Sequence, residues 1–419
     1  MNNHCFDNKK KLISIKKAKK IILGECKVSK YHETIDINDC VGRVVFQDIK
    51  SQINVPPHNN SAVDGYGFNF EDYKKNRDKK FKIVGSSKPG KPFNRKISSG
   101  ELIEIFTGAP ILKKCNQLQV DTVIMEEDVS NTLNNSIKLP SNIKKGSNIR
   151  LFGEDIKKND KIYNKGRKIR PLDIGYLASV GISKIKVFKR IKVGIFSTGN
   201  EISDSKYKKK FQIFDSNKLT LIFLLKKIGC EIIDLGIIYD DYNESKKKIL
   251  DSTKKCDLII TTGGISTGKT DNISKVLQVI GQLDVWRLAV KPGRPMAFGK
   301  VKAKPFFGLP GNPVAVVLTF LMFVTEFIRK MNGRTVDTIK YNLIPSSFSF
   351  EKKVGRTEWL RGNVVERKSN LFLEKFYSEG SGILSSVART EGIIEIESNK
   401  KSIKKGELLK FYKYEEFLN

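Results

Sequence analysis

Histidine and paired cysteines are scarce in this chain. Only three histidines occur among 419 residues, and only His58 lies near a glycine-rich motif. A serine or cysteine triad needs a histidine base, so the sequence argues against hydrolysis by such a triad. The six cysteines are scattered and form no CxxC pair. We therefore expect free thiols in a reducing cytosol, with neither a zinc site nor a disulfide framework.

Long apolar runs are also missing. The longest extends from Val314 to Val324, is interrupted only by Thr319, and is soon followed by Glu326. It is too short to cross a bilayer and is typical of a buried helix. The N-terminal residues lack the apolar core of a secretory signal. With only 13 prolines and 32 glycines, no long disordered tract is predicted, and we expect a soluble, cytoplasmic protein.

Acidic residues are greatly outnumbered by basic ones. The chain has 45 Asp and Glu against 77 Lys and Arg, which gives a net charge of +32. The basic residues are mostly lysines spread along the whole sequence, without a nucleic-acid motif or an aromatic–basic stripe. We therefore expect neither a nucleic acid nor a membrane as a partner. A general positive field would still attract small anions.

The pattern of apolar residues changes along the chain. Residues 80–150 carry short apolar strands separated by Gly, Pro, Ser and Asn, which predicts a β-rich region. From residue 190 strands and helices alternate, which predicts a parallel sheet covered by helices. Short β-type runs return over residues 340–415. Helices are predicted at 11–25, 170–182, 216–228 with Ser216 as the cap, 243–255, and from Val314 to about Met331.

A glycine-rich loop follows the apolar strand at Leu258–Ile260. Its sequence GGISTGKT, at 263–270, matches the phosphate-binding P-loop, in which Lys269 would reach a terminal phosphate and Thr270 would hold Mg²⁺. About twenty residues of helix-like sequence come next. Against a P-loop, at least two strand–helix units precede the motif. No strand ending in a Walker B carboxylate follows it, and Asp271 would have no role.

Ten sequence blocks give a second interpretation. They are NNSAVDGYG at 59–67, FTGAP at 106–110, FGEDI at 152–156, FSTGNEI at 196–202, DSN at 215–217, TTGGISTGKTD at 261–271, KPGRP at 291–295, GLPGNPV at 308–314, GRTEWLRG at 355–362 and EGSGILSS at 379–386. In this order, and over nearly the whole chain, they resemble the molybdopterin molybdenumtransferase family, which includes MoeA and the gephyrin E domain. The match to a P-loop is then accidental.

The resemblance implies a multidomain fold of class α/β and β. Its parts would be an elongated split domain at 1–53 and 150–188, an inserted β-rich domain at 54–149 that carries the NNSAVDGYG loop, a three-layer α/β molybdopterin-binding domain at 189–334, and a small β-barrel-like C-terminal domain at 335–419. The implied reaction uses adenylylated molybdopterin and molybdate as substrates. Cleavage that depends on Mg²⁺ releases AMP, and the metal passes to the dithiolene sulfurs, which gives molybdenum cofactor.

The resemblance also implies the site residues. The catalytic set is Asp155, Glu201, Asp241 and Asp271, and the metal ligands are Glu201, Asp240 and Asp241. Substrate would be bound by Asn60, Ser61, Asp64, Thr107, Asp215, Ser216, Asn217, Gly263, Gly264, Ser266, Gly268, Lys291, Arg294, Pro295, Pro310 and Asn312. Glycine turns and basic side chains suit phosphate and pterin, and carboxylates suit Mg²⁺. Simple structural roles remain open for Pro310 and Pro313 as turn residues, and for Glu201 and Asp215 as caps.

Partners follow from the same resemblance. In the family's homodimer, the Ser61–Asp64 loop of one subunit faces the α/β domain of the other, and contact with other cofactor-biosynthesis proteins and apo-molybdoenzymes is implied. The chain departs from the family at Asn59, where an Asp is typical, and also at His58, Gly67 and a longer loop at 111–120. Two other functions stay open: a P-loop NTPase, and a molybdopterin-binding protein of the same fold without catalysis. The choice between molybdate and tungstate is also open.

Overall fold

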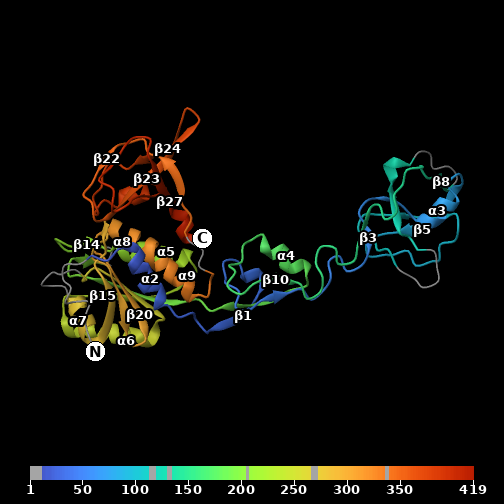
Figure 1. Ribbon diagram of the computed structural model, residues 1–419. Helices are drawn as coiled ribbons and strands as arrows, with labels where there is room; N and C mark the ends of the chain where they lie inside the picture. The colour runs from blue at the N-terminus through green and yellow to red at the C-terminus, as the bar shows by residue number, and fades with distance from the viewer. Residues whose placement is uncertain (1–11, 113–118, 130–134, 204–206, 266–271, 336–338) are drawn as a thin grey trace.

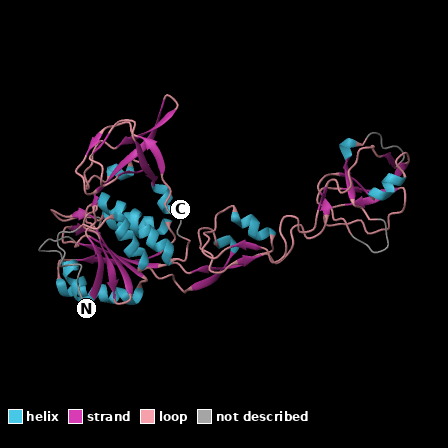
Figure 2. Cartoon of the chain, viewed as in Figure 1, coloured by secondary structure: helices cyan, strands magenta, loops and turns pink. Residues whose placement is uncertain are grey.

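The protein forms an elongated chain of four bodies (Figures 1 and 2). The computed structural model describes residues 12–112, 119–129, 135–203, 207–265, 272–335 and 339–419. An α/β body and a C-terminal β body lie together at one end, a slender middle body follows, and a β-rich body forms the other end. Among these residues, every helix is too short or too polar to cross a membrane.

A six-stranded sheet forms the centre of the α/β body. Its order is β15-β12-β16-β20-β19-β17; the first four strands are parallel, β19 is antiparallel to β20, and β17 is antiparallel to β19. The strands are β12 (Lys192–Thr198), β15 (Glu231–Ile238), β16 (Leu258–Thr262), β17 (Gly281–Trp286), β19 (Ala297–Val301) and β20 (Lys304–Leu309). The predicted parallel sheet is therefore confirmed for one part only. A tight turn after Val301, with Lys302 at a φ of 54°, makes β19 and β20 a hairpin.

Helices cover both faces of this sheet, as the alternating pattern predicts (Figures 1 and 2). They are α5 (Ser216–Lys227), α6 (Tyr242–Lys255), α7 (Asn272–Ile280), α8 (Pro313–Thr319) and α9 (Thr325–Met331), and a π-helical turn at Phe320–Val324 joins α8 to α9. The helix after the glycine loop is shorter than predicted, because residues 281–286 pair with β19 as strand β17. The cap of α5 is Asp215 rather than the predicted Ser216.

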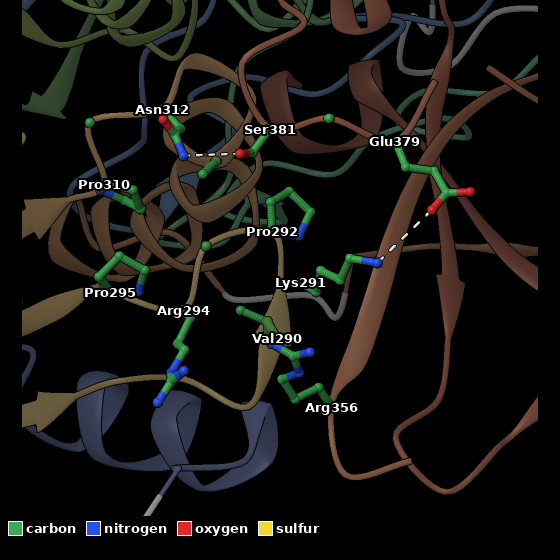
Figure 3. A pocket seen from close by; sticks show the side chains of 14 residues that line it. Val290, Lys291, Pro292, Arg294, Pro295, Pro310, Asn312, Arg356, Glu379 and Ser381 are labelled. Atoms are coloured by element: carbon green, nitrogen blue, oxygen red, sulfur yellow. Dashed lines mark hydrogen bonds and ion pairs between the residues drawn. The ribbon is translucent and has the colours of Figure 1, made fainter. Parts of the chain in front are cut away.

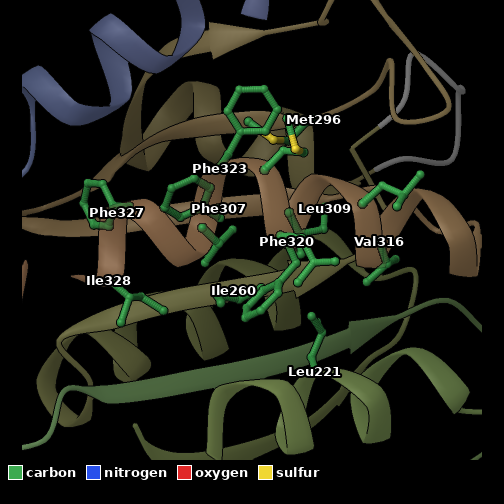
Figure 4. Packing of buried hydrophobic residues seen from close by; sticks show 14 of the residues in the cluster. Leu221, Ile260, Met296, Phe307, Leu309, Val316, Phe320, Phe323, Phe327 and Ile328 are labelled. Carbon is green, nitrogen blue, oxygen red and sulfur yellow. The ribbon is translucent and has the colours of Figure 1, made fainter. Parts of the chain in front are cut away.

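The largest core lies between the sheet and the helix formed by α8 and α9. Figure 4 shows Phe320 packed toward Ile260 and Phe327 beside Phe307 of the sheet. The helix is apolar on all sides because α2 (Ile15–Gly24) and the C-terminal body cover the faces turned from the sheet. Helix α2 thus packs in the core of the α/β body, although the sequence predicts it within the split domain.

Two separate chain segments build the middle body. Strand β1 (His32–Asp36) pairs with β11 (Lys184–Phe188), and β2 (Ile49–Lys50) pairs with β10 (Lys161–Tyr163), in both cases antiparallel. The short helices η1 (Ile37–Asp39) and α4 (Asp173–Ser179) complete it. Buried aliphatic side chains from both segments form one core, so neither segment can fold this body alone.

The β-rich body contains a five-stranded sheet of order β7-β4-β6-β5-β8. Its elements are β4 (Gly65–Phe68), β5 (Lys80–Ser87), β6 (Glu101–Ile105), β7 (Thr122–Met125) and β8 (Ser136–Lys138), with α3 (Phe70–Lys75) and η2 (Glu126–Asp128) beside them. A two-stranded pair, β3 (Asn60–Ser61) with β9 (Ile149–Arg150), lies between this sheet and the middle body.

The C-terminal body includes one strand that the α/β body supplies. Its main sheet has the order β18-β23-β25-β27-β21. The strands are β18 (Val290–Lys291), β21 (Asn342–Pro345), β23 (Thr357–Arg367), β25 (Gly392–Ile396) and β27 (Leu408–Lys413), and β24 (Asn370–Lys375) also pairs with β23. Smaller elements are β22 (Phe350–Glu351), β26 (Ser402–Ile403), α10 (Ser385–Ala388) and α11 (Tyr414–Leu418). Because β18 pairs with β23, the KPGRP loop is fixed between two bodies.

Candidate functional site

Two cavities adjoin at the carboxyl ends of the parallel strands. The glycine-loop cavity has a volume of about 450 Å³ and is bounded by the ends of β12, β16 and β20 and the start of α5. The interdomain cavity has a volume of about 620 Å³ and lies between the α/β and C-terminal bodies (Figure 3). The two share a wall made of Pro295, Pro310, Gly311 and Asn312. A ligand with two chemically different parts could therefore occupy both.

Two glycines give the glycine-loop cavity its floor. Gly263 and Gly264 have φ angles of 83° and 66°, which side chains rarely tolerate. A Cβ on Gly263 would come within 2.8 Å of Thr198 Oγ1, and one on Gly264 within 2.7 Å of the Ile273 side chain. The Thr198 hydroxyl donates to the Thr262 carbonyl at 2.9 Å and so ties β12 to the loop. The predicted residues Ser266, Gly268 and Asp271 lie outside the described residues, as do Lys269 and Thr270.

The DSN turn forms the side of this cavity. Asp215 accepts hydrogen bonds from the backbone N–H of Lys218, at 3.0 Å, and from the Ser197 hydroxyl. Its carboxylate is therefore committed to capping α5 and anchoring it to β12. Asn217 donates to the carbonyl of Gly311 at 2.7 Å, which holds the GLPGNP loop. Ser216 lines the cavity between them. The DSN turn thus places this side of the cavity at the N-terminus of α5. Backbone N–H groups at a helix N-terminus favour the binding of anions.

Two carboxylates remain directed to the glycine-loop cavity. Glu201 and Asp240 both line it and are exposed, whereas Asp241 caps α6 by accepting from the Glu244 N–H at 2.6 Å. Across the residues that the structure describes, no three His, Cys, Asp or Glu side chains are grouped closely enough to hold a metal ion. Of the three predicted metal ligands, then, two share the cavity and the third has a capping role.

The interdomain cavity has a cationic lining. Lys291, Arg294 and Arg356 lie around it, and the ring edges of Pro292 and Pro295 complete one side (Figure 3). The Nζ of Lys291 is 3.2 Å from a Glu358 carboxylate oxygen and 3.9 Å from one of Glu379. An incoming oxyanion would therefore compete with two carboxylates for this lysine.

A turn of the C-terminal body closes the interdomain cavity. Asn312 donates to the Ser381 hydroxyl at 2.9 Å, and the Val314 N–H donates to the Ser381 carbonyl at 3.1 Å. The buried guanidinium of Arg361 braces the same turn by donating to the Ser378 carbonyl at 3.0 Å and to the Ser386 hydroxyl at 2.9 Å. The sequence predicts no site residue in the C-terminal body, although Arg361 lies in the block GRTEWLRG, and Ser381 and Ser386 lie in EGSGILSS.

The predicted residues of the NNSAVDGYG loop lie elsewhere. Asp64 accepts from the backbone N–H of Thr107 at 2.6 Å and from its hydroxyl at 2.8 Å, and these bonds lower the pKa of Asp64. Ser61 is buried and donates to the Val63 carbonyl at 2.6 Å. Both belong to the part of the chain farthest from the α/β body (Figure 1). Within one chain, neither lines the two cavities.

Two further predicted residues and the Asn59 departure belong to this distant region. Asn60 is buried in β3, and Asp155 is exposed where its backbone N–H donates to the Val55 carbonyl at 3.1 Å. The side-chain oxygen of Asn59 accepts from the Phe152 N–H at 2.7 Å. A carboxylate could accept the same bond, so the substitution of Asn for the family's Asp keeps the loop in place while removing one negative charge.

Comparison with known proteins supports one family. The chain matches the MoeA N-terminal region (domains I and II) over residues 13–181, the probable molybdopterin-binding domain over 194–330, and the MoeA C-terminal region (domain IV) over 344–414. It is 33% identical over 404 residues to a molybdopterin molybdenumtransferase of Haemophilus influenzae, covering 94% of this chain and 97% of that protein. A putative molybdopterin biosynthesis protein of Methanocaldococcus jannaschii is 30% identical over 423 residues, with 96% and 98% covered.

Solved structures agree. Two crystal structures of a molybdopterin biosynthesis MoeA protein from Pyrococcus horikoshii match with a TM-score of 0.82, at 29% and 26% identity. Each match covers 96% of this chain, and 99% or 100% of the other. The chain therefore belongs to the molybdopterin molybdenumtransferase family, and the predicted fold class is confirmed.

Proposed function

We propose that this protein inserts molybdate into adenylylated molybdopterin and releases AMP in a reaction that depends on Mg²⁺. Family membership assigns the chain to molybdenum cofactor biosynthesis as a transferase. The observation that carries the finer proposal is the pair of adjoining cavities with different chemistry. One offers glycine turns and carboxylates, the other cationic side chains, and a single wall separates them. Two substrates that must exchange a metal could thus be held side by side.

The interdomain cavity suits the oxyanion. Lys291, Arg294 and Arg356 supply charge-assisted donors, and Ser381 adds a hydroxyl. Molybdate is a small tetrahedral dianion, so several donors on different elements can bind it at once. The carboxylates of Glu358 and Glu379 hold the Lys291 side chain in place before molybdate binds. Tungstate has the same shape and charge, so this cavity would accept it as well.

The glycine-loop cavity suits the adenylylated pterin. Glu201 and Asp240 offer oxygen ligands of the kind that Mg²⁺ prefers, and water and phosphate oxygens would complete its coordination. Bound there, Mg²⁺ would neutralise charge on the phosphates as the bond to AMP breaks. Asp215 and Asn217 fix the walls, and Asp241 orients α6 rather than the metal. Asp271 keeps its predicted catalytic role in the glycine loop.

The decisive experiment is AMP release by the purified protein. Adenylylated molybdopterin, molybdate and Mg²⁺ should together yield AMP and molybdenum cofactor, with little AMP when molybdate or Mg²⁺ is left out. Binding of the pterin without AMP release would instead indicate a binding protein without catalysis. Turnover of ATP without a pterin, lost in Lys269→Ala, would indicate a P-loop NTPase, which the family relationship does not favour.

We further propose a cytoplasmic homodimer in which the Ser61–Asp64 loop of one subunit completes the site of the other. The support is that this loop, which Thr107 contacts through Asp64, belongs to the β-rich body, and that body lies at the opposite end of the chain from the cavities. Co-expression of Asp64→Ala with Glu201→Gln tests it, because half of randomly paired dimers would contain one intact site of two. Activity should then recover to about a quarter of wild type. No recovery in a mixed dimer would refute the shared site. Contact with other cofactor-biosynthesis proteins and apo-molybdoenzymes remains part of the proposal.

A further inference from the structure

One part of the glycine-loop cavity's lining is apolar and exposed. Ile213 and Phe214 line it, and their side chains are 56% and 55% exposed. The rest of the lining includes glycine backbone and polar side chains, among them Thr198, Glu201 and Asp240. Covering an aromatic side chain that is exposed to water at a cavity entrance lowers the free energy. This part of the lining therefore suits an apolar or aromatic group of a ligand.

The backbone that carries this wall is held firmly. Strand β14 (Ile213–Phe214) pairs in parallel with β13 (Ile202–Ser203). The Ile213 N–H donates to the Glu201 carbonyl at 2.8 Å, and the Asp215 N–H donates to the Ser203 carbonyl at 3.1 Å. Phe214 is thus fixed between an anchored strand residue and the residue that caps α5. Its ring is presented at the cavity by a preformed backbone, which lowers the ordering cost of stacking a ligand on it.

From this arrangement we propose that Phe214, supported by Ile213, is the stacking platform for a planar heteroaromatic ring of the substrate. The inference rests on the proposed function and deepens it by naming the part of the substrate that each wall recognises. A ring on Phe214 would present its edge to the polar walls, where ring N–H groups can donate to backbone carbonyls of the glycine turns, while Glu201 and Asp240 stay available to Mg²⁺. The phosphate of the substrate would remain in the glycine-loop cavity, within reach of the Mg²⁺ that Glu201 and Asp240 would hold.

Pterin and adenine both have this chemistry, since each is planar and carries ring N–H donors. The two are distinguished by measuring binding of AMP and of a soluble pterin separately. Phe214→Ala should weaken binding of the ring that stacks there by about fivefold to a hundredfold, as expected for loss of one stacked ring. Phe214→Trp retains an aromatic face and should bind about as well as wild type. Molybdate binding should be unchanged in both variants.

Phe223 provides a matched control. It lies about two turns into α5, is 62% exposed and lines neither cavity. Phe223→Ala removes a similar exposed ring and should leave AMP and pterin binding unchanged. Unchanged binding of both ligands in Phe214→Ala would overturn the platform, and so would equal losses in Phe214→Ala and Phe223→Ala. A change of oligomeric state alone in Phe214→Ala would overturn it too, because the ring would then belong to a subunit contact.

These outcomes are separable from failure of the proposed function. If wild-type protein makes molybdenum cofactor and Phe214→Ala does so with unchanged KM for the pterin substrate, only the platform is wrong. If wild-type protein binds AMP or pterin through Phe214 but releases no AMP from the adenylylated substrate, the platform stands and the reaction is wrong.

Discussion

The carboxylates of the middle body and those of the glycine-loop cavity lie in opposite environments. Asp173 is only 2% exposed, and its carboxylate is 2.9 Å from both Arg167 and Arg170. Glu201 and Asp240 are exposed at a cavity, and no cation pairs with either among the residues that the structure describes. A carboxylate with partners contributes to folding, whereas one facing an open cavity is available to a ligand. Residue type alone does not separate the two.

The largest expected effect is on catalysis. Glu201→Gln keeps the size of the side chain but removes the charge that would hold Mg²⁺. AMP release should fall about a hundredfold, while the free energy of unfolding stays within about 0.5 kcal/mol of wild type. Activity assays over a range of Mg²⁺ concentrations, together with urea unfolding, test this. A large decrease in the free energy of unfolding would instead show that Glu201, like Asp173, contributes to folding, and would contradict the difference drawn between them.

A second variant tests the cationic cavity. Lys291→Met removes the donor that Glu358 and Glu379 hold in place. The KM for molybdate should rise about tenfold or more, with little change in the KM for the pterin substrate, because loss of one charge-assisted bond weakens oxyanion binding. An equal rise in both KM values would show that the two cavities do not act separately.

A third variant tests the middle body. Burial acts to raise the pKa of Asp173, but hydrogen bonds from Arg170 and Arg167 outweigh it, so the pKa lies well below its usual range. The stability that this group contributes is present above its unfolded-state pKa of about 4 and is lost as the pH falls toward the folded-state pKa. Asp173→Asn should cost about 2 kcal/mol at pH 7 and less at pH 3. Urea midpoints at both pH values test this, and an equal cost at both would contradict it.

The smallest effect is expected at Asp241. Asn caps helices about as well as Asp, so Asp241→Asn should change the free energy of unfolding by less than about 0.5 kcal/mol. If capping of α6 is its only role, the Mg²⁺ dependence of AMP release should also be unchanged. A raised Mg²⁺ requirement would restore Asp241 as the third metal ligand.

The sequence predicts the fold class well because the strand–helix alternation and the ten blocks act over long stretches. The sequence does not predict the elements whose structure depends on tertiary contacts. Residues 281–286 read as helix but pair with β19, and α2 joins the α/β core because Ala18 and Ile22 pack there. Each outcome depends on a partner distant in sequence, which local periodicity cannot identify.

The candidate site shows the same limit. The residues around the glycine loop are predictable because single motifs supply them. Arg356, Glu379 and Ser381 reach the interdomain cavity only through the docking of the C-terminal body. Asp215 and Asp241 have the residue type of ligands, but both cap helices; the sequence leaves this role open for Asp215, and the geometry shows it for both.

Strand β18 has a mechanical consequence. Val290 and Lys291 leave the α/β body and become an edge strand of the C-terminal sheet, where Val290 pairs with Thr357 and Lys291 with Glu358. The Thr357 N–H also donates to the Ala289 carbonyl at 2.9 Å. The two bodies are thus connected by strand pairing at Val290 and Lys291, which also line the interdomain cavity. A movement that separated the two bodies would break this pairing and displace Lys291 from the cavity that it lines.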